Sequence, residues 1–233
     1  VKKPVIGIIA TGTELLNVSD PLVPGKIRNS NASMVMAQVE EAGGTPLYLG
    51  KISDDFEESF DAVKKALEKV DFLITTGGVS VGDFDFLPAI YEKLGAEVLF
   101  NKIAMRPGSV TTVAHLDGKL LFGLSGNPSA CFVGFELFVK PSVRTWLLDQ
   151  KPYALCAVAV LSRDFPKPNP FTRFVRSFVS VKDGMLQAEP VGLDKSSAVT
   201  SLADANALVV LPGGTRGYEA GRRVHVLLYR DEN

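Results

Sequence analysis

Short apolar runs alternate with amphipathic stretches along the first 150 residues. An apolar run of four to eight residues indicates a buried strand, and apolar residues three or four apart indicate a helix with one buried face. The expected elements are strand 5–10, helix 31–42, strand 46–51, helix 55–69, strand 72–76, a helix through 87–91, strands 97–101, 111–115 and 119–124, and helix 128–148. This alternation predicts a three-layer α/β domain whose mostly parallel sheet is covered by helices.

Beyond Lys151 the pattern changes to short β-rich runs. Prolines at positions 152, 166, 168 and 170 interrupt the chain, and the helical spacing of apolar residues is lost. The expected strands are 154–161, 173–181, 185–190, 207–211 and 223–229. We therefore predict two domains, an α/β domain at residues 1–150 and a small all-β, barrel-like domain at residues 151–233.

Composition narrows the class of protein. The net charge of −1 argues against a nucleic-acid-binding surface, which needs clustered Lys and Arg. No run of 18 apolar residues occurs, and the first residues lack the apolar core of a signal peptide. The two cysteines stand apart in apolar surroundings, so we expect reduced thiols and a cytoplasmic location. Two histidines exclude a multi-histidine zinc site. Because Val1 stands directly before a strand, we expect the chain to be part of a longer polypeptide.

The most informative polar segment follows strand 72–76. Gly77, Gly78 and Gly82 allow backbone angles that other residues avoid, and they let amide groups approach a ligand closely, as in phosphate-binding turns. In open α/β sheets, ligands bind at this carboxyl end of the strands. Asp85 can cap the helix that follows. A purely structural glycine turn is the alternative reading.

Acidic residues follow three successive strands. Glu14, Asp54 and the pair Asp83 and Asp85 are all expected at the same edge of the sheet, where they suit divalent-metal binding or acid–base chemistry. Each also has a structural reading. Asp54 and Glu57 could form a capping box, Asp85 could be only an N-cap, and Glu14 could be a solvated turn residue.

Three further segments could bind an anion. Residues 123–129 form a strand-turn-helix junction in which Asn127 suits the N-cap and Pro128 the first helical position. Arg106 lies in the tight turn 105–108, and its guanidinium can donate two hydrogen bonds to a phosphate or oxyanion. A solvated loop arginine is the alternative. A polar set precedes the first long helix and is equally consistent with a ligand-binding or a connecting loop: Lys26, Arg28, Asn29, Ser30 and Asn31.

Seven motifs occur in order along nearly the whole chain. They are Thr11-Gly12-Thr13-Glu14-Leu15, Ser30-Asn31, Ser53-Asp54-Asp55, the turn 77–85, Met105-Arg106-Pro107-Gly108, the junction 123–129 and the tail segment 196–208. Together they resemble the molybdopterin molybdotransferase family of the MoeA and gephyrin E-domain type. The resemblance implies a MogA- or MoaB-like molybdopterin-binding domain followed by the β domain.

The resemblance also implies an activity. Family members hydrolyse adenylylated molybdopterin, release AMP and insert molybdate into the dithiolene with Mg²⁺. By motif, Glu14, Asp54 and Asp85 match the acidic catalytic positions, and Asp54 and Asp85 are the expected metal ligands. The matched substrate-binding positions are Thr11, Gly12, Gly77, Gly78, Val79, Ser80, Gly82, Asp83, Arg106, Pro107, Gly108, Ser125, Gly126, Asn127, Pro128 and Ser129.

Partners follow from the same resemblance. Molybdopterin-AMP is the expected ligand, the full-length protein is expected to be a homodimer, and the molybdopterin adenylyltransferase is a possible partner. A non-catalytic pterin-nucleotide-binding or scaffolding module of the same fold is the main alternative. The related competence-damage-type hydrolases fit less well, because their turn would read GGLGPT where this chain has Gly77-Gly78-Val79-Ser80-Val81-Gly82.

Overall fold

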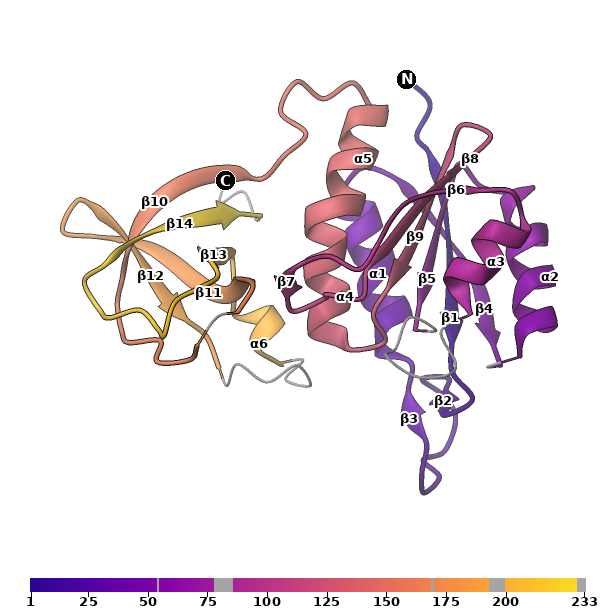
Figure 1. The fold of residues 1–233 in the computed structure, drawn as a ribbon, viewed down its shortest axis with the longest axis horizontal. Helices are drawn as coiled ribbons and strands as arrows, with labels where there is room; N and C mark the ends of the chain where they lie inside the picture. Colours follow the sequence, from indigo (N-terminus) through magenta and orange to yellow (C-terminus); the bar gives the residue numbers. More distant parts are fainter. Residues whose placement is uncertain (54, 78–85, 169, 193–199, 230–233) are drawn as a thin grey trace. The chain divides into compact units, whose positions relative to one another are not determined.

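The computed structural model describes residues 1–53, 55–77, 86–168, 170–192 and 200–229 (Figure 1). The chain divides into two units. The first comprises Val1–Ile103 and Val110–Pro152, and the second comprises Ala104–Ser109 and the chain from Tyr153 onward. The short stretch 104–109 therefore belongs with the β-rich part, whereas the sequence pattern had grouped it with the α/β domain.

The first unit is built on a six-stranded sheet. Its strands are β1 (Val5–Thr11), β4 (Thr45–Ile52), β5 (Phe72–Thr76), β6 (Glu97–Asn101), β8 (Thr112–Leu116) and β9 (Lys119–Leu124). Their order is β4-β1-β5-β9-β8-β6. The first four pair in parallel, and β8 runs antiparallel to both of its neighbours. The predicted mostly parallel sheet is confirmed.

Helices cover both faces of this sheet (Figure 1). On one face lie α1 (Ser30–Glu41) and the consecutive α4 (Pro128–Gly134), η1 (Phe135–Val139) and α5 (Lys140–Trp146); on the other lie α2 (Phe56–Leu67) and α3 (Leu87–Lys93). Neighbouring β1 residues face opposite ways, so Ile8 joins the first core and Ile9 the second. Burying each such side chain contributes about 1.5–3 kcal/mol.

Two predicted helix caps are displaced by one residue. Asp55, and not Asp54, is the N-cap of α2, where its carboxylate accepts the N–H of Glu58 at 2.8 Å. The predicted capping box of Asp54 and Glu57 is therefore wrong, because the helix begins one residue later. The N-cap of α3 is Phe86, so the predicted capping by Asp85 is also wrong.

The predicted helix 128–148 contains a π-helical segment. Its beginning is confirmed, since Asn127 is the N-cap and Pro128 occupies the first turn. At η1 the helix widens, and the N–H of Lys140 donates to the carbonyl of Phe135, five residues earlier. Pro141 follows directly, and it has no N–H to donate to the carbonyl four residues before it. Regular α-helical bonding is thus interrupted at this point.

The second unit is a closed barrel of five strands. They are β10 (Leu155–Leu161), β11 (Thr172–Lys182), β12 (Met185–Pro190), β13 (Ala207–Leu211) and β14 (Arg223–Leu228). Pairing runs β12-β10-β14-β13-β11 and closes where β11 meets β12. The short β7 (Met105–Arg106) pairs in parallel with the first two residues of β11, Thr172 and Arg173. The predicted small, barrel-like β domain is confirmed.

The barrel encloses its own apolar core, which includes Val175, Val179, Val209 and Val226. Besides the strands, this unit contains the one-turn helix α6 (Thr200–Ala203). Among the helices of the described chain, none combines the length and the apolar content that crossing a bilayer requires.

Candidate functional site

A cavity of about 510 Å³ opens at the carboxyl ends of β1, β5 and β9 in the first unit. Eight predicted site residues line it: Thr11, Gly12, Glu14, Gly77, Ser125, Gly126, Asn127 and Pro128. These residues come from three segments, the first and last of which are more than 100 positions apart in the chain, and the parallel sheet brings them together. The location is the one at which open α/β sheets bind ligands.

Gly77 holds the ends of two strands together. Its N–H donates to the carbonyl of Leu124 at 3.0 Å, and its φ of 91° lies in the left-handed region. A Cβ at this position would lie 2.6 Å from the carbonyl oxygen of Thr11. Glycine is therefore required both by the backbone angle and by the close approach of the β1 end.

Glu14 places a carboxylate over the neighbouring Gly12. A Cβ on Gly12 would lie 2.6 Å from Oε2 of Glu14, and the φ of Gly12 is 142°. The N–H of Gly12 donates to the carbonyl of Ile52 at the end of β4. The absence of a side chain at position 12 thus leaves room for the Glu14 carboxylate beside the backbone of Gly12.

The turn 125–129 is fixed from two sides. The hydroxyl oxygen of Ser125 accepts the N–H of Asn127, and the amide oxygen of Asn127 accepts the N–H of Ser129, both at 3.2 Å. From α1, the side-chain N–H of Asn31 donates to the carbonyl of Gly126 at 2.8 Å. A hydroxyl, an amide and a glycine are thereby held at the cavity wall in a defined arrangement.

Three cationic side chains surround the segment that carries Glu14. Lys26 donates to the carbonyl of Thr13 at 2.7 Å, Lys51 donates to that of Leu15 at 2.9 Å, and Arg28 donates to those of residues 17 and 18. These carbonyl partners carry no formal charge, so the hydrogen bonds leave the positive charges in place. Arg28 also lines the cavity, which favours an anionic occupant.

Comparison with known proteins then decides the family. The family described as "Probable molybdopterin binding domain" matches residues 7–145, and "MoeA C-terminal region (domain IV)" matches residues 158–229. The chain belongs to the MoeA-type molybdopterin-binding family. This confirms the resemblance drawn from the ordered motifs.

Named relatives agree with this membership. The chain is 78% identical over 233 residues to the molybdopterin molybdenumtransferase of Bacillus subtilis (strain 168), covering 100% of this chain and 54% of that protein. Two structures of the molybdopterin biosynthesis MoeA protein from Pyrococcus horikoshii are 29% and 27% identical, with TM-scores of 0.84 and 0.74. They align over 98% and 97% of this chain and over 55% and 54% of theirs. The chain thus spans about half the length of these relatives.

The remaining predicted positions of this MoeA-type chain divide into two groups. Asp54, Gly78, Val79, Ser80, Gly82, Asp83 and Asp85 lie outside the described residues. Within the described ranges there is no group of three or more His, Cys, Asp or Glu side chains that could hold a metal ion. The convergence of three acids therefore stays a prediction, with Glu14 alone placed at the cavity.

Arg106, Pro107 and Gly108 belong to the second unit. Arg106 pairs with Arg173 of β11, and its guanidinium lies 5.9 Å from the ring centre of Phe171. Its bond to Pro107 is cis. Their predicted part in ligand binding stays a prediction. Ser129, the other predicted residue, is buried and donates its backbone N–H within the 125–129 turn.

The sequence did not decide the role of one segment that the structure places in the cavity wall. Residues Arg28, Asn29, Ser30 and Asn31 all line the cavity, although they read equally as a connecting loop. Asn29 is the N-cap of α1, and its side-chain N–H donates to the hydroxyl of Tyr48. The signal was the Ser30-Asn31 motif, but only the contact with Gly126, 95 positions away, shows what it binds.

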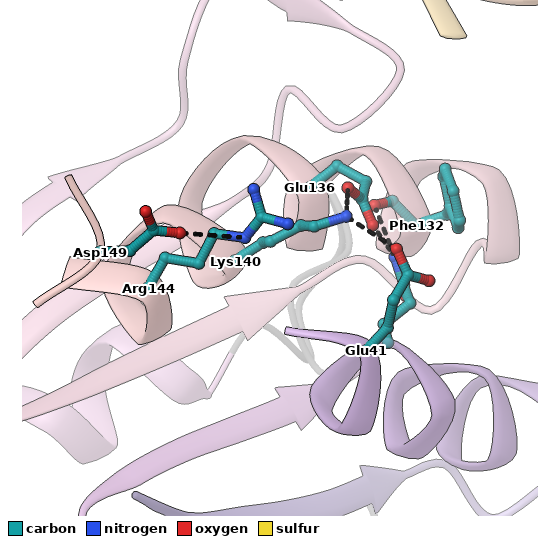
Figure 2. A network of polar contacts seen from close by, with 7 residues as sticks. Glu41, Phe132, Glu136, Lys140, Arg144 and Asp149 are labelled. Atoms are coloured by element: carbon teal, nitrogen blue, oxygen red, sulfur yellow. Dashed lines mark hydrogen bonds and ion pairs between the residues drawn. The ribbon is translucent and has the colours of Figure 1, made fainter. Parts of the chain in front are cut away.

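A second polar region lies farther along the same helices (Figure 2). Lys140 lies 3.1 Å from Oε2 of Glu136 and 2.9 Å from Oε1 of Glu41, and the side-chain N–H of Gln38 donates to Oε1 of Glu136 at 2.9 Å. The Lys140 and Glu136 side chains are only 5% and 4% exposed. Burial raises the pKa of Glu136, and the Lys140 ammonium opposes that shift.

Proposed function

We propose that this chain carries the substrate site of a molybdopterin molybdenumtransferase. Adenylylated molybdopterin binds in the 510 Å³ cavity, molybdate enters its dithiolene, and AMP is released. The observation that carries the proposal is the convergence of Glu14, Gly77 and the 125–127 turn on one cavity within the matched molybdopterin-binding domain.

The chemistry of the cavity suits this ligand. Adenylylated molybdopterin carries a pyrophosphate, hydroxyl groups and a pterin with several hydrogen-bonding positions. The Ser125 hydroxyl and the Asn127 amide line the wall and can bond such groups, and Arg28 adds a positive charge for the pyrophosphate. Because Gly77 carries no side chain, its backbone lies close to the end of β1 in the cavity wall, with no side chain of its own to occupy the cavity.

Glu14 is the residue proposed for the hydrolytic step. Its carboxylate can accept a hydrogen bond from the attacking water and orient that water toward the phosphoanhydride. Carboxylate oxygens are also the ligands that Mg²⁺ prefers, so Glu14 fits a magnesium site to which Asp54 and Asp85 would contribute. A bound Mg²⁺ would neutralise negative charge on the pyrophosphate.

The proposed active site also needs parts of the whole protein that lie outside this chain. Because relatives are about twice as long, we propose that further domains and a second subunit of a cytoplasmic homodimer complete the active site. The adenylyltransferase that makes the ligand is the proposed donor partner. A non-catalytic binding module is the second candidate, since the cavity can bind a pterin nucleotide whether or not chemistry follows.

Measuring AMP release tests the catalytic proposal. The intact protein is supplied with adenylylated molybdopterin, Mg²⁺ and molybdate, and Glu14→Gln is compared with Glu40→Gln, an exposed glutamate on α1. Loss of the water-orienting carboxylate should lower kcat by about 100-fold or more, and the control should be unchanged. Equal rates for Glu14→Gln and the wild type would contradict the role of Glu14. Ligand binding without any AMP release by the wild type would favour the non-catalytic module.

A further inference from the structure

The chain has two cysteines and two histidines, and one of each meet on the barrel unit. Cys156 lies on β10, where its free thiol is exposed. His225 lies on β14 and is also exposed. The Sγ atom of Cys156 lies 4.0 Å from Nδ1 of His225. Thiolate and imidazole are both ligands for copper and zinc ions, so the pair is a candidate for metal binding.

The strand register places both side chains on the outer face of the barrel. Side chains alternate along a strand, and Ala159 and Val226 belong to the apolar core of the barrel. Cys156 and His225 therefore point away from that core. Because Val158 pairs with His225, Cys156 is the diagonal neighbour of His225 across two antiparallel strands. Diagonal neighbours on one face are close enough for their side chains to meet.

The backbone beneath the pair is held by neighbouring strands. β14 lies between β10 and β13 and pairs with both. Leu227 pairs with Cys156, and His225 pairs with Val158 on one side and with Val210 on the other. Sites built on paired strands hold their ligands more precisely than sites on loops. The three paired neighbours are apolar, so they offer no competing ligand beside the thiol and the imidazole.

The separation of the two atoms leaves room for one ion between them. For zinc, a d10 ion, bonds to thiolate and imidazole are about 2.3 and 2.0 Å, so a linear arrangement spans about 4.3 Å and a tetrahedral one about 3.6 Å. The observed 4.0 Å corresponds to an open angle of about 135°. No third His, Cys, Asp or Glu side chain of the described chain joins the pair. Two ligands at an open angle suit an ion of low coordination number better than zinc, which takes four ligands in structural sites.

We propose that Cys156 and His225 bind a soft monovalent d10 cation of the copper(I) class. The thiol releases its proton as the sulfur–metal bond forms, and the neutral Nδ1 of His225 provides its lone pair to the same ion. The thiolate and the cation neutralise each other, and no electron is transferred. The pair lies in the second unit and does not line the 510 Å³ cavity, so this inference does not rest on the proposed function.

The other cysteine provides an internal comparison. Cys131 lies on α4 of the first unit and is fully buried, and burial raises its pKa to about 12. A thiol that solvent does not reach and that resists losing its proton is a poor metal ligand. We therefore expect Cys156, and not Cys131, to bind the ion.

Titration of the intact protein with copper(I) under anaerobic conditions tests the site, with bicinchoninate as the competing chelator. Cys156→Ser should remove one bound equivalent relative to the wild type, together with its thiolate-to-copper ultraviolet band. His225→Gln should weaken that equivalent by about tenfold or more, the least that losing even an outer-shell partner costs. Silver(I), which has the same charge and a filled d shell, is the second probe and should behave alike.

The chain offers a matched control for each variant. His115→Gln changes the other histidine, which is exposed on β8, and Cys131→Ala changes the other cysteine. Both should bind as the wild type does, and circular dichroism establishes that Cys131→Ala is folded. Cys156 and His225 are exposed, so their variants should fold normally.

Three results would overturn the proposal. The first is a Cys156→Ser protein that keeps every bound equivalent. The second is a His225→Gln protein that binds copper(I) as tightly as His115→Gln does. The third is displacement of copper(I) from the pair by an excess of zinc, which would contradict the assignment to a soft monovalent ion. Retention of copper(I) against zinc, lost only in the two site variants, is the result the proposal predicts.

Discussion

The same two helical segments, α1 and α4–η1–α5, build two polar regions of opposite character. At their N-terminal ends, Asn31 and Asn127 line an open cavity and bond mainly to backbone groups. Farther along, Glu136 pairs with Lys140 in a place that solvent hardly reaches (Figure 2). Glu136 also accepts a hydrogen bond from Gln38 of α1. One region presents polar groups to a ligand, and the other pairs a buried carboxylate with a buried ammonium inside the helix pair.

This difference shows why a polar residue in a helix pair does not by itself mark a site. In the closed region, each buried charge faces an opposite charge, and removing one partner leaves the other without compensation. In the open region, the polar side chains set the backbone geometry of a turn while the cavity stays available. Variants in the two regions should therefore separate stability from ligand binding.

The largest expected effect is on the closed region. Lys140→Met should lower the free energy of unfolding by about 3–5 kcal/mol, because Glu136 would stay buried without its cation. Urea denaturation followed by circular dichroism measures the change, with the exposed Lys65→Met on α2 as control. Affinity of the folded variant for adenylylated molybdopterin should be unchanged. A loss below about 1 kcal/mol would show that the cluster is not a buried ion pair in solution.

A smaller effect on stability, but a larger one on binding, is expected at the cavity. Gly77→Ala should cost about 2 kcal/mol or more, since a left-handed φ costs a non-glycine residue about 1–2 kcal/mol and the new Cβ would also meet the Thr11 carbonyl. Ligand affinity should fall with it. Gly50→Ala is the matched control, because Gly50 has a similar φ of 101° but open space around it. Equal costs at both glycines would mean that the close approach contributes nothing.

The smallest expected effect is a pH dependence of the closed region. Because the pKa of Glu136 is raised in the folded state, its contribution to stability is present below the unfolded pKa and is lost as the pH rises through the folded pKa. The stability of the wild type relative to Glu136→Gln should therefore fall as the pH rises from about 4, near the ordinary pKa of a glutamate, toward neutrality. Urea midpoints across this range measure it. A difference that rises with pH would mean that the attraction of Lys140 outweighs the effect of burial.

Much of the fold could be predicted because apolar runs end at turn residues. Strands 97–101, 119–124, 185–190 and 207–211 were predicted to the residue. The two-residue β7 could not be predicted, since so short a strand has no periodicity and its partner β11 follows more than 60 positions later. The π-helical segment also left no apolar signal, although Pro141 marks where regular bonding fails.

The cavity was predictable for a different reason. Residues that follow parallel strands meet at one edge, so the positions of Thr11, Gly77 and Ser125 followed from the strand assignment alone. The role of Asn31 required a contact between segments 95 positions apart, which no local pattern encodes. The position of Arg106 could not be predicted either. Its place in the chain suggested the first unit, but its pairing with β11 places it in the second.

The most direct test is a crystal structure of the intact protein with adenylylated molybdopterin bound. The account predicts that the ligand occupies the cavity at the ends of β1, β5 and β9, with its pyrophosphate within hydrogen-bonding distance of Ser125, Asn127 or Arg28 and with Glu14 facing the phosphoanhydride. A ligand bound elsewhere, with this cavity empty, would contradict the central claim that the open polar region of the helix pair is the substrate site.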